Sequence, residues 1–230
     1  MSDVVERALA ERVRRLQVRP EPLPVGGVPE WLRARVRDAL AAGETHYTDR
    51  PGIPELRRAL ALPFSSMGLE RGADEVVVTS GEKEALFVSL LALALGPGDA
   101  AVAFGRCAHE ELFELLGFHP ASSTSRPRLR YTELVETPPD WSSREAPLIV
   151  NLGSGVLGDL PRWIVEDDPI VLGNLDALPG LASFRVGFVC APAALAKKVR
   201  SWKQTLSICT AAPSQRAAYE AWRAAKGGEP

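Results

Sequence analysis

The chain has 230 residues, of which 46% are hydrophobic and 24% are charged, and its formal net charge is −2. This length is enough for one sizeable domain with a hydrophobic core, or for a domain and an arm. The near-neutral charge gives no reason to expect nucleic acid or an anionic membrane as a partner. Lysine is scarce, because arginine supplies most of the 27 basic residues. The lysines are Lys83, Lys197, Lys198, Lys203 and Lys226.

Cysteine and histidine usage argues against a disulfide framework and against a metal site. Three widely spaced cysteines without a CxxC pair indicate reduced thiols in a cytoplasmic protein. The histidines lack ligand spacing with carboxylates or cysteines. The first residues are charged and helical in pattern rather than a signal peptide, and no apolar run is long enough to span a bilayer. The residues concerned are Cys107, Cys190, Cys209, His46, His109 and His119.

The first third of the chain has helical spacing of apolar residues, interrupted by a segment rich in proline and glycine. Pro29 suits the first turn of a helix, and Gly43 suits its end. The expected elements are a helix at 4–16, an extended arm at 19–30, a helix at 29–42 and a helix that begins near Pro54.

From Asp74 onward, short β-branched runs alternate with helical segments. Uniformly apolar strands alternating with helices indicate a parallel sheet covered on both faces, and hence an α/β fold of three layers. The segment 120–146 is polar and has no assigned structure. The expected strands are 75–81, 100–104, 147–153, 163–168, 169–175 and 184–191, and the expected helices are 82–95, 109–117, 193–206 and 214–225.

Two segments carry recognisable motifs. In residues 46–61, Tyr47 is followed five residues later by Gly52, and a leucine-arginine pair, Leu56 and Arg57, opens a helix. In residues 76–99, a strand leads through Gly81 into a helix, and then to a GPGD turn. The free backbone N–H groups and the positive dipole at such a helix start favour an anion.

Both segments resemble the class I and II aminotransferases of fold type I, which use pyridoxal phosphate. The resemblance implies that Gly81, Glu82 and Lys83 surround the cofactor phosphate. It also implies that Tyr47 reaches across a dimer interface to the phosphate of the other subunit. Glu82 departs from this pattern, since a carboxylate pointing inward would repel phosphate. The aromatic residue that stacks on the cofactor ring is also missing, because His109 and its neighbours stand near that place.

Two further segments continue the resemblance. Asn151 is the nearest match to the asparagine that contacts the cofactor ring oxygen, although the proline that should follow it is absent. Asp167, in the expected strand 163–168, matches the aspartate that pairs with the pyridine nitrogen and keeps the ring protonated. The segment between Asp167 and Gly173 is much shorter than is usual in the family.

The fourth segment, residues 171–192, resembles the strand and loop that carry the Schiff-base lysine. The family places this lysine eight residues before an arginine, which is Arg185 here, and the resemblance implies that Arg185 is one of the cofactor-binding residues. Ala177 occupies the lysine position, Asn174 replaces the phosphate-binding serine, and Asp176 replaces the serine before the lysine. No other lysine lies between Lys83 and Lys197.

The resemblance therefore implies a large domain of the aminotransferase type at 45–230, preceded by a helical segment and arm at 1–44. The small C-terminal domain, which in the family binds the substrate carboxylate, is expected to be absent. A homodimer is the expected assembly, because the Tyr47 segment and the proline-rich arm are kept. A heterodimer with a full-length relative is the alternative, and a membrane or nucleic acid is not expected as a partner.

Three interpretations of function follow. The first is a catalytically inactive aminotransferase-like protein that acts by binding, because alanine can neither bond to the cofactor nor transfer a proton. Pyridoxal phosphate, or its pyridoxamine form, would then bind without a covalent bond or would be lost. The second is an active enzyme of the family that uses another lysine, such as Lys83. The third is an α/β domain that binds a different ligand in the same pocket.

Overall fold

The structure is a computed structural model and describes residues 27–95, 101–121, 126–141, 144–154 and 160–228. A seven-stranded sheet lies at its centre, with the strand order β1-β7-β6-β5-β4-β2-β3. The strands are β1 (Val76–Thr79), β2 (Ala101–Phe104), β3 (His119–Pro120), β4 (Leu129–Glu133), β5 (Leu148–Asn151), β6 (Ile170–Asn174) and β7 (Gly187–Cys190).

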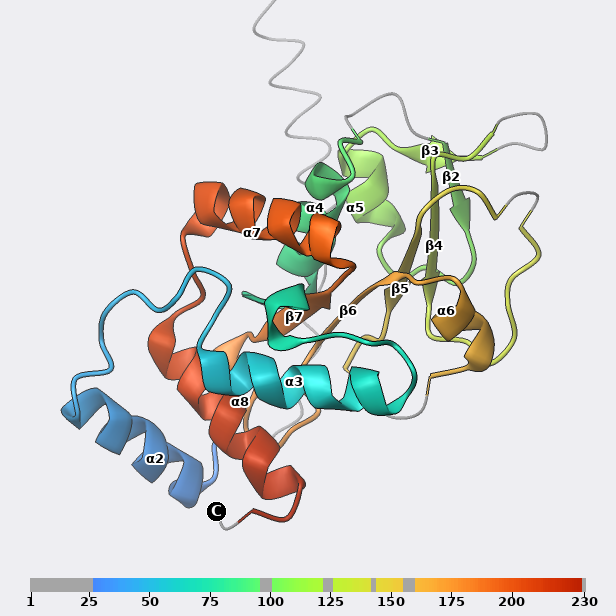
Figure 1. The fold of residues 1–230 in the computed structure, drawn as a ribbon. Helices are drawn as coiled ribbons and strands as arrows, with labels where there is room; N and C mark the ends of the chain where they lie inside the picture. Colours follow the sequence, from blue (N-terminus) through green and yellow to red (C-terminus); the bar gives the residue numbers. More distant parts are fainter. Residues whose placement is uncertain (1–26, 96–100, 122–125, 142–143, 155–159, 229–230) are drawn as a thin grey trace, which may run out of the picture.

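Helices cover both faces of this sheet, as Figure 1 shows. The α-helices are α2 (Glu30–Ala41), α3 (Pro54–Ser66), α4 (Glu82–Ala92), α5 (Glu110–Leu115), α6 (Arg162–Glu166), α7 (Ala193–Ser207) and α8 (Ala212–Ala225). Two short 3-10 helices, η1 (Ala73–Glu75) and η2 (Ala182–Phe184), precede β1 and β7. Within the described part of the chain, no helix is both long enough and apolar enough to cross a membrane.

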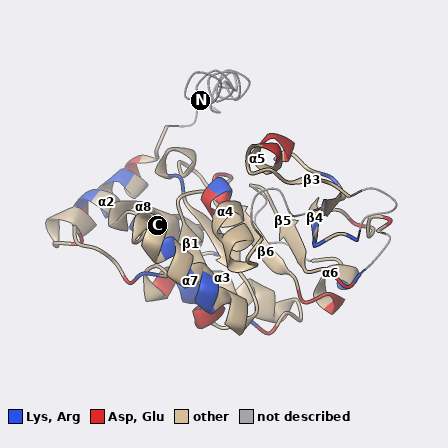
Figure 2. Ribbon diagram, turned by 90° about the horizontal axis from the view of Figure 1, so that it is seen from above, with Lys and Arg blue, Asp and Glu red and all other residues tan. Residues whose placement is uncertain are grey.

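The sheet separates two hydrophobic clusters, as expected for three layers. Val76 and Val78 of β1 pack with Phe64 of α3 in one cluster. Val77, between them, packs with Leu86 of α4 in the other. This alternation follows from the two-residue period of a strand. Charged side chains lie mainly on the outer helices and loops, while β1, β5 and β6 carry none (Figure 2). The predicted α/β fold is therefore confirmed.

The direction of the strands brings the ends of several strands, with their adjoining loops, together at one edge of the sheet. Strands β2 to β6 run parallel to one another, and β7 runs antiparallel to its two neighbours, β1 and β6. Gly187, the first residue of β7, is therefore the register partner of Thr79 at the end of β1 and of Asn174 at the end of β6. The carboxyl ends of the parallel strands and the amino end of β7 meet at this edge, where α/β sheets commonly bind ligands.

Most expected elements are confirmed, including the helix ended by Gly43 and the helix beginning at Pro54. The strand predicted at 163–168 is wrong: residues 162–166 form the short helix α6, capped by Pro161. The unassigned segment 120–146 contains strand β4. The helix predicted at 4–16 lies outside the described residues, as do most of the arm at 19–30 and the GPGD turn. The division of the chain at residue 44 stays a prediction, while α2 packs against α8.

Candidate functional site

Gly81 and Arg185 approach each other at this edge of the sheet. Gly81 caps α4, and Arg185 precedes β7, and both have positive φ angles, 85° and 54°. A side chain at Gly81 would place its Cβ 3.0 Å from Arg185 Nη2. A Cβ on Gly187 would lie 2.5 Å from the carbonyl carbon of Gly81, so the two segments pass too closely for any residue but glycine at 187. This packing places a guanidinium beside the amino end of α4.

A group of polar side chains, the Glu82 group, lies at this edge and consists of Glu82, His109, Asn174, Asp176 and Arg185. The Glu82 carboxylate is at its centre. Asn174 Nδ2 donates a hydrogen bond of 2.7 Å to Glu82 Oε2, and His109 Nε2 lies 3.0 Å from Glu82 Oε1. Its interaction with His109 is the largest cause that lowers the pKa of Glu82, and Asn174 and Arg185 act in the same direction, while burial opposes them. Glu82 is therefore an ionised carboxylate held by surrounding donors.

Asp176 adds a second carboxylate to the group. Its backbone N–H donates to Asn174 Oδ1 at 2.9 Å, and its Oδ2 lies 4.0 Å from Arg185 Nη1. Burial raises the pKa of Asp176, and the charge of Glu82 raises it further, against the charge of Arg185. Ala177 follows at an exposed position and brings no amine to the group. The loop after β6 therefore contributes an acidic side chain where the family carries a lysine loop.

Asn151 lies at the end of β5, one strand further along the sheet. Its Nδ2 donates to the hydroxyl of Tyr131 at 3.2 Å, and its Oδ1 accepts from the N–H of Gly153 at 2.9 Å. Burial raises the pKa of Tyr131, and the nearby charge of Glu82 raises it further. Asn151 is thus buried next to the polar group, but both ends of its amide are bound to neighbours in the protein.

Three predicted site residues are not part of this group. Tyr47 is 79% exposed on the loop between α2 and α3. Lys83 is exposed on the first turn of α4. Asp167 lies before the amino end of β6, where it forms two hydrogen bonds, of 2.7 and 3.0 Å, with buried Arg130. It is a structural ion-pair partner at the opposite end of the strand, because the segment predicted as its strand is a helix.

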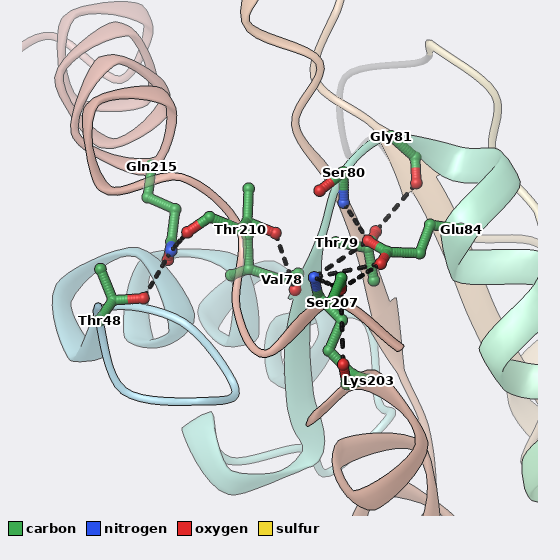
Figure 3. A network of polar contacts seen from close by, with 10 residues as sticks. All are labelled: Thr48, Val78, Thr79, Ser80, Gly81, Glu84, Lys203, Ser207, Thr210 and Gln215. Atoms are coloured by element: carbon green, nitrogen blue, oxygen red, sulfur yellow. Dashed lines mark hydrogen bonds and ion pairs between the residues drawn. The ribbon is translucent and has the colours of Figure 1, made fainter. Parts of the chain in front are cut away.

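A second polar network, which the sequence did not predict, supports the Gly81 turn from the other side (Figure 3). Lys203 of α7 is fully buried, and its Nζ lies 3.1 Å from Glu84 Oε2 and 2.6 Å from Ser207 Oγ. Ser207 donates to Glu84 Oε1 at 2.6 Å, and the other oxygen of Glu84 accepts from the N–H of Ser80. Burial raises the pKa of Glu84, but these hydrogen bonds and the charge of Lys203 outweigh it, so the pKa is lowered. The network fixes the start of α4 to the end of α7.

Comparison with known proteins shows which proteins this chain is similar to in sequence. Residues 23–110 match the family model "Aminotransferase class I and II". Aspartate/prephenate aminotransferase of Thermus thermophilus is 45% identical over 75 residues, which are 32% of this chain and 19% of the relative. Aspartate aminotransferase of Thermotoga maritima is 42% identical over 86 residues, which are 37% of this chain and 21% of the relative. The matched segment thus spans about a fifth of these curated relatives.

Similarity in three dimensions extends over nearly the whole chain. The structure of aspartate aminotransferase from Thermus thermophilus with maleate matches with a TM-score of 0.73 at 21% identity, covering 97% of this chain and 70% of that one. Aspartate aminotransferase from Rhizobium meliloti matches with a TM-score of 0.69 at 20% identity, covering 88% and 62%. These matches confirm the resemblance. The chain is similar to the class I and II aminotransferases of fold type I, and its fold is that of their large domain.

Pyridoxal phosphate is the cofactor that this family uses, and the residues present do not fit it. Its phosphate dianion at the start of α4 would lie beside the Glu82 and Asp176 carboxylates, and Asn174 already donates to Glu82. Like charges that lie side by side repel strongly where solvent is partly excluded. Alanine stands at position 177, and Asp167 is bound elsewhere. The Glu82 carboxylate already accepts from Asn174, a donor that an anionic ligand would otherwise use.

Proposed function

We propose that this chain is an aminotransferase-like protein without transaminase activity, and that it acts by binding. The observation that carries the proposal is Ala177 at the position of the cofactor lysine, eight residues before Arg185. Transamination needs an amine that bonds to the cofactor aldehyde and transfers a proton at the substrate carbon, and alanine does neither. Loss of general acid–base catalysis alone costs about 10²–10⁴-fold in rate.

The remaining lysines near this edge do not replace it. Lys203 is fully buried, and its ammonium is committed to Glu84 and Ser207. Lys83 is exposed on the first turn of α4, and no described carboxylate or hydroxyl orients its amine. A lysine nucleophile must be accessible to the cofactor aldehyde and held in place by its neighbours. Lys203 is held but not accessible, and Lys83 is accessible but not held by any described residue, which argues against an active enzyme that uses a non-standard lysine.

The direct test is reduction with borohydride in the presence of pyridoxal phosphate, followed by peptide mass spectrometry. We expect Lys83 to carry no more pyridoxyl adduct than the exposed surface lysines Lys197 and Lys198. A stoichiometric adduct on Lys83 alone would contradict the proposal and support an active enzyme.

Two obstacles to cofactor binding, the missing lysine at position 177 and the Glu82 carboxylate, can be separated by substitution. We expect Ala177→Lys alone to give little yellow absorption with pyridoxal phosphate, because Glu82 still repels the phosphate. The double variant Ala177→Lys/Glu82→Gln removes this negative charge and is expected to give a clear band. Equal absorption in both variants would show that Glu82 does not exclude the cofactor.

We further propose that the protein forms a homodimer through the face that carries Tyr47. Gln215 Nε2 donates both to Thr48 Oγ1, at 2.8 Å, and to the Thr210 carbonyl, at 2.6 Å, so it joins the Tyr47 loop to the segment after α7 (Figure 3). Large apolar side chains on the Tyr47 loop, in the last turn of α7 and just after α7 are exposed, and monomers rarely leave a large apolar patch in water. These side chains are Tyr47, Leu206 and Ile208.

Light scattering of the purified chain at tens of micromolar tests the dimer. We expect the mass of two chains, and the mass of one chain in the variant Leu206→Ser/Ile208→Ser. A monomer in both cases would refute the homodimer and leave a heterodimer with a full-length relative as the alternative.

The free thiols of Cys107, Cys190 and Cys209 suit the reducing cytoplasm, which we propose as the location.

A further inference from the structure

A hollow lined by arginines lies beside the Tyr47 loop and shares no lining residue with the group described above. Its volume is about 490 Å³, and it opens to solvent between the loop before α3 and helix α7. Figure 1 shows this loop passing below α7. The lining residues are Thr48, Asp49, Arg50, Pro51, Arg57 and Arg200. The lining thus contains three arginines and one acidic residue, Asp49, so its formal charge is positive.

Arg57 gives the hollow a fixed wall. Its side chain is buried, and its Nε donates to the carbonyl of Gly52 at 3.1 Å. Its Nη1 donates to the carbonyl of Ala73 at 2.9 Å and lies 3.2 Å from the Asp74 carboxylate. The exposed Asp74 carboxylate offsets part of the charge of Arg57 from outside the lining. A guanidinium held by three acceptors cannot move away, so its position is set before any ligand arrives.

Arg200 and Arg50 have donors to spare. Arg200 Nη2 donates to the Asp74 carbonyl at 2.8 Å, while its Nε is buried and has no hydrogen-bond partner among the described residues. A buried donor without a partner costs about 1–3 kcal/mol. The exposed Arg50 side chain makes no hydrogen bond or ion pair with any described residue. The Arg50 guanidinium and the unbonded donors of Arg200 are thus left for a ligand.

We propose that this hollow binds an anion that carries a phosphate group. Guanidinium groups present planar pairs of N–H donors that match phosphate oxygens, and they keep their charge at any physiological pH. The Thr48 hydroxyl in the same lining donates to the Asp49 carbonyl, so the donors for a phosphate come from the arginines. The site is separate from the Glu82 group, and the inference does not depend on the proposed function.

Calorimetric titration with inorganic phosphate, at ionic strength held constant with chloride, tests the site. We expect saturable binding to the protein in its solution oligomeric state, and a rise in thermal stability with phosphate concentration. Arg200→Gln and Arg50→Gln are each expected to weaken binding about tenfold or more, the value of one charge-assisted hydrogen bond. Because the exposed Arg50 side chain makes no hydrogen bond or ion pair with the described residues, its replacement is expected to leave the fold intact and keeps the test valid if Arg200→Gln unfolds.

Two control variants decide where phosphate binds. Arg58→Gln, which removes an exposed charge from α3, and Arg185→Gln, which removes the guanidinium beside Gly81, are both expected to bind like the original protein. Loss of binding in Arg185→Gln alone would place the anion at the start of α4 and overturn both this inference and the exclusion of phosphate by Glu82. Absence of saturable binding would overturn this inference and leave the proposed function untouched.

Discussion

Replacement of Lys203 by methionine tests how strongly the network in Figure 3 stabilises the fold. The Lys203 side chain is 0% exposed and that of Glu84 is 16% exposed. Methionine is close to the lysine stem in length, so Lys203→Met removes the ammonium without opening a large cavity. The main effect is that the Glu84 carboxylate loses its counter-charge while it stays partly buried.

The expected loss in the free energy of unfolding depends on the partners that Glu84 keeps. Removing one member of a buried ion pair costs about 3–5 kcal/mol. Glu84 still accepts hydrogen bonds from Ser207 Oγ and from the N–H of Ser80, which places the expected loss near the lower limit, about 3 kcal/mol. For a chain of this size, such a loss lowers the midpoint of thermal unfolding by roughly 6–12 °C.

Urea unfolding followed by tryptophan fluorescence gives the free energy of unfolding of each variant. Lys197→Met and Lys198→Met, which replace exposed lysines of the same helix, are expected to stay within about 0.5 kcal/mol of the original protein. The double variant Lys203→Met/Glu84→Gln leaves no uncompensated charge and is expected to recover most of the loss. If Lys203→Met were no more destabilising than the exposed replacements, the ion pair would not be the element that holds α7 to α4.

Three further perturbations test other contacts. Gly187→Ala places a Cβ 2.5 Å from the Gly81 backbone, so we expect a loss of at least about 1–3 kcal/mol in urea unfolding. Arg130→Met leaves the largely buried Asp167 carboxylate unpaired and is expected to cost about 3–5 kcal/mol, most of which Asp167→Asn should restore in the double variant. Because the folded pKa of Glu82 lies below its ordinary value of 4.5, its ionisation stabilises the fold above that pH, and this contribution is lost as the pH falls through the folded pKa. The difference in stability between the original protein and Glu82→Gln is therefore expected to shrink in acid; a difference independent of pH would refute this role of the charge.

The order of strands and helices was largely predictable because it depends on local patterns. Apolar β-branched runs predicted β1, β5 and β6, and these are fully buried in the sheet. Strand β4 was missed because it carries Arg130, a residue typical of surfaces, whose burial depends on Asp167 far along the chain. Helix α6 was taken for a strand, since a short apolar run between prolines has no period that separates the two structures.

The part of the site that was predictable is the set of residues that lie at or next to the ends of strands. Asn174 and Arg185 were placed near the start of α4 by the resemblance, and the register of β6 with β7 brings them together. The sequence could not show that Asn174 donates to Glu82, which requires a particular side-chain orientation across the sheet edge. Lys203 gave no signal, because its burial results from the packing of α7 against α4 and not from its sequence neighbours.

The neighbourhood of β1 and β7 has a consequence for how the chain reaches its fold. Val76 pairs with Cys190, so the earliest described strand finds its sheet partner only after more than a hundred further residues have been synthesised. Closing so long a loop slows folding, because the entropy loss precedes the contacts that offset it. Until then, the three valines of β1 form an unpaired apolar edge, which is the kind of segment that aggregates or engages chaperones. Ribosome-stalled chains that end before Gly187 should therefore be protease-sensitive throughout, and protection should appear abruptly once β7 and α7 have left the exit tunnel.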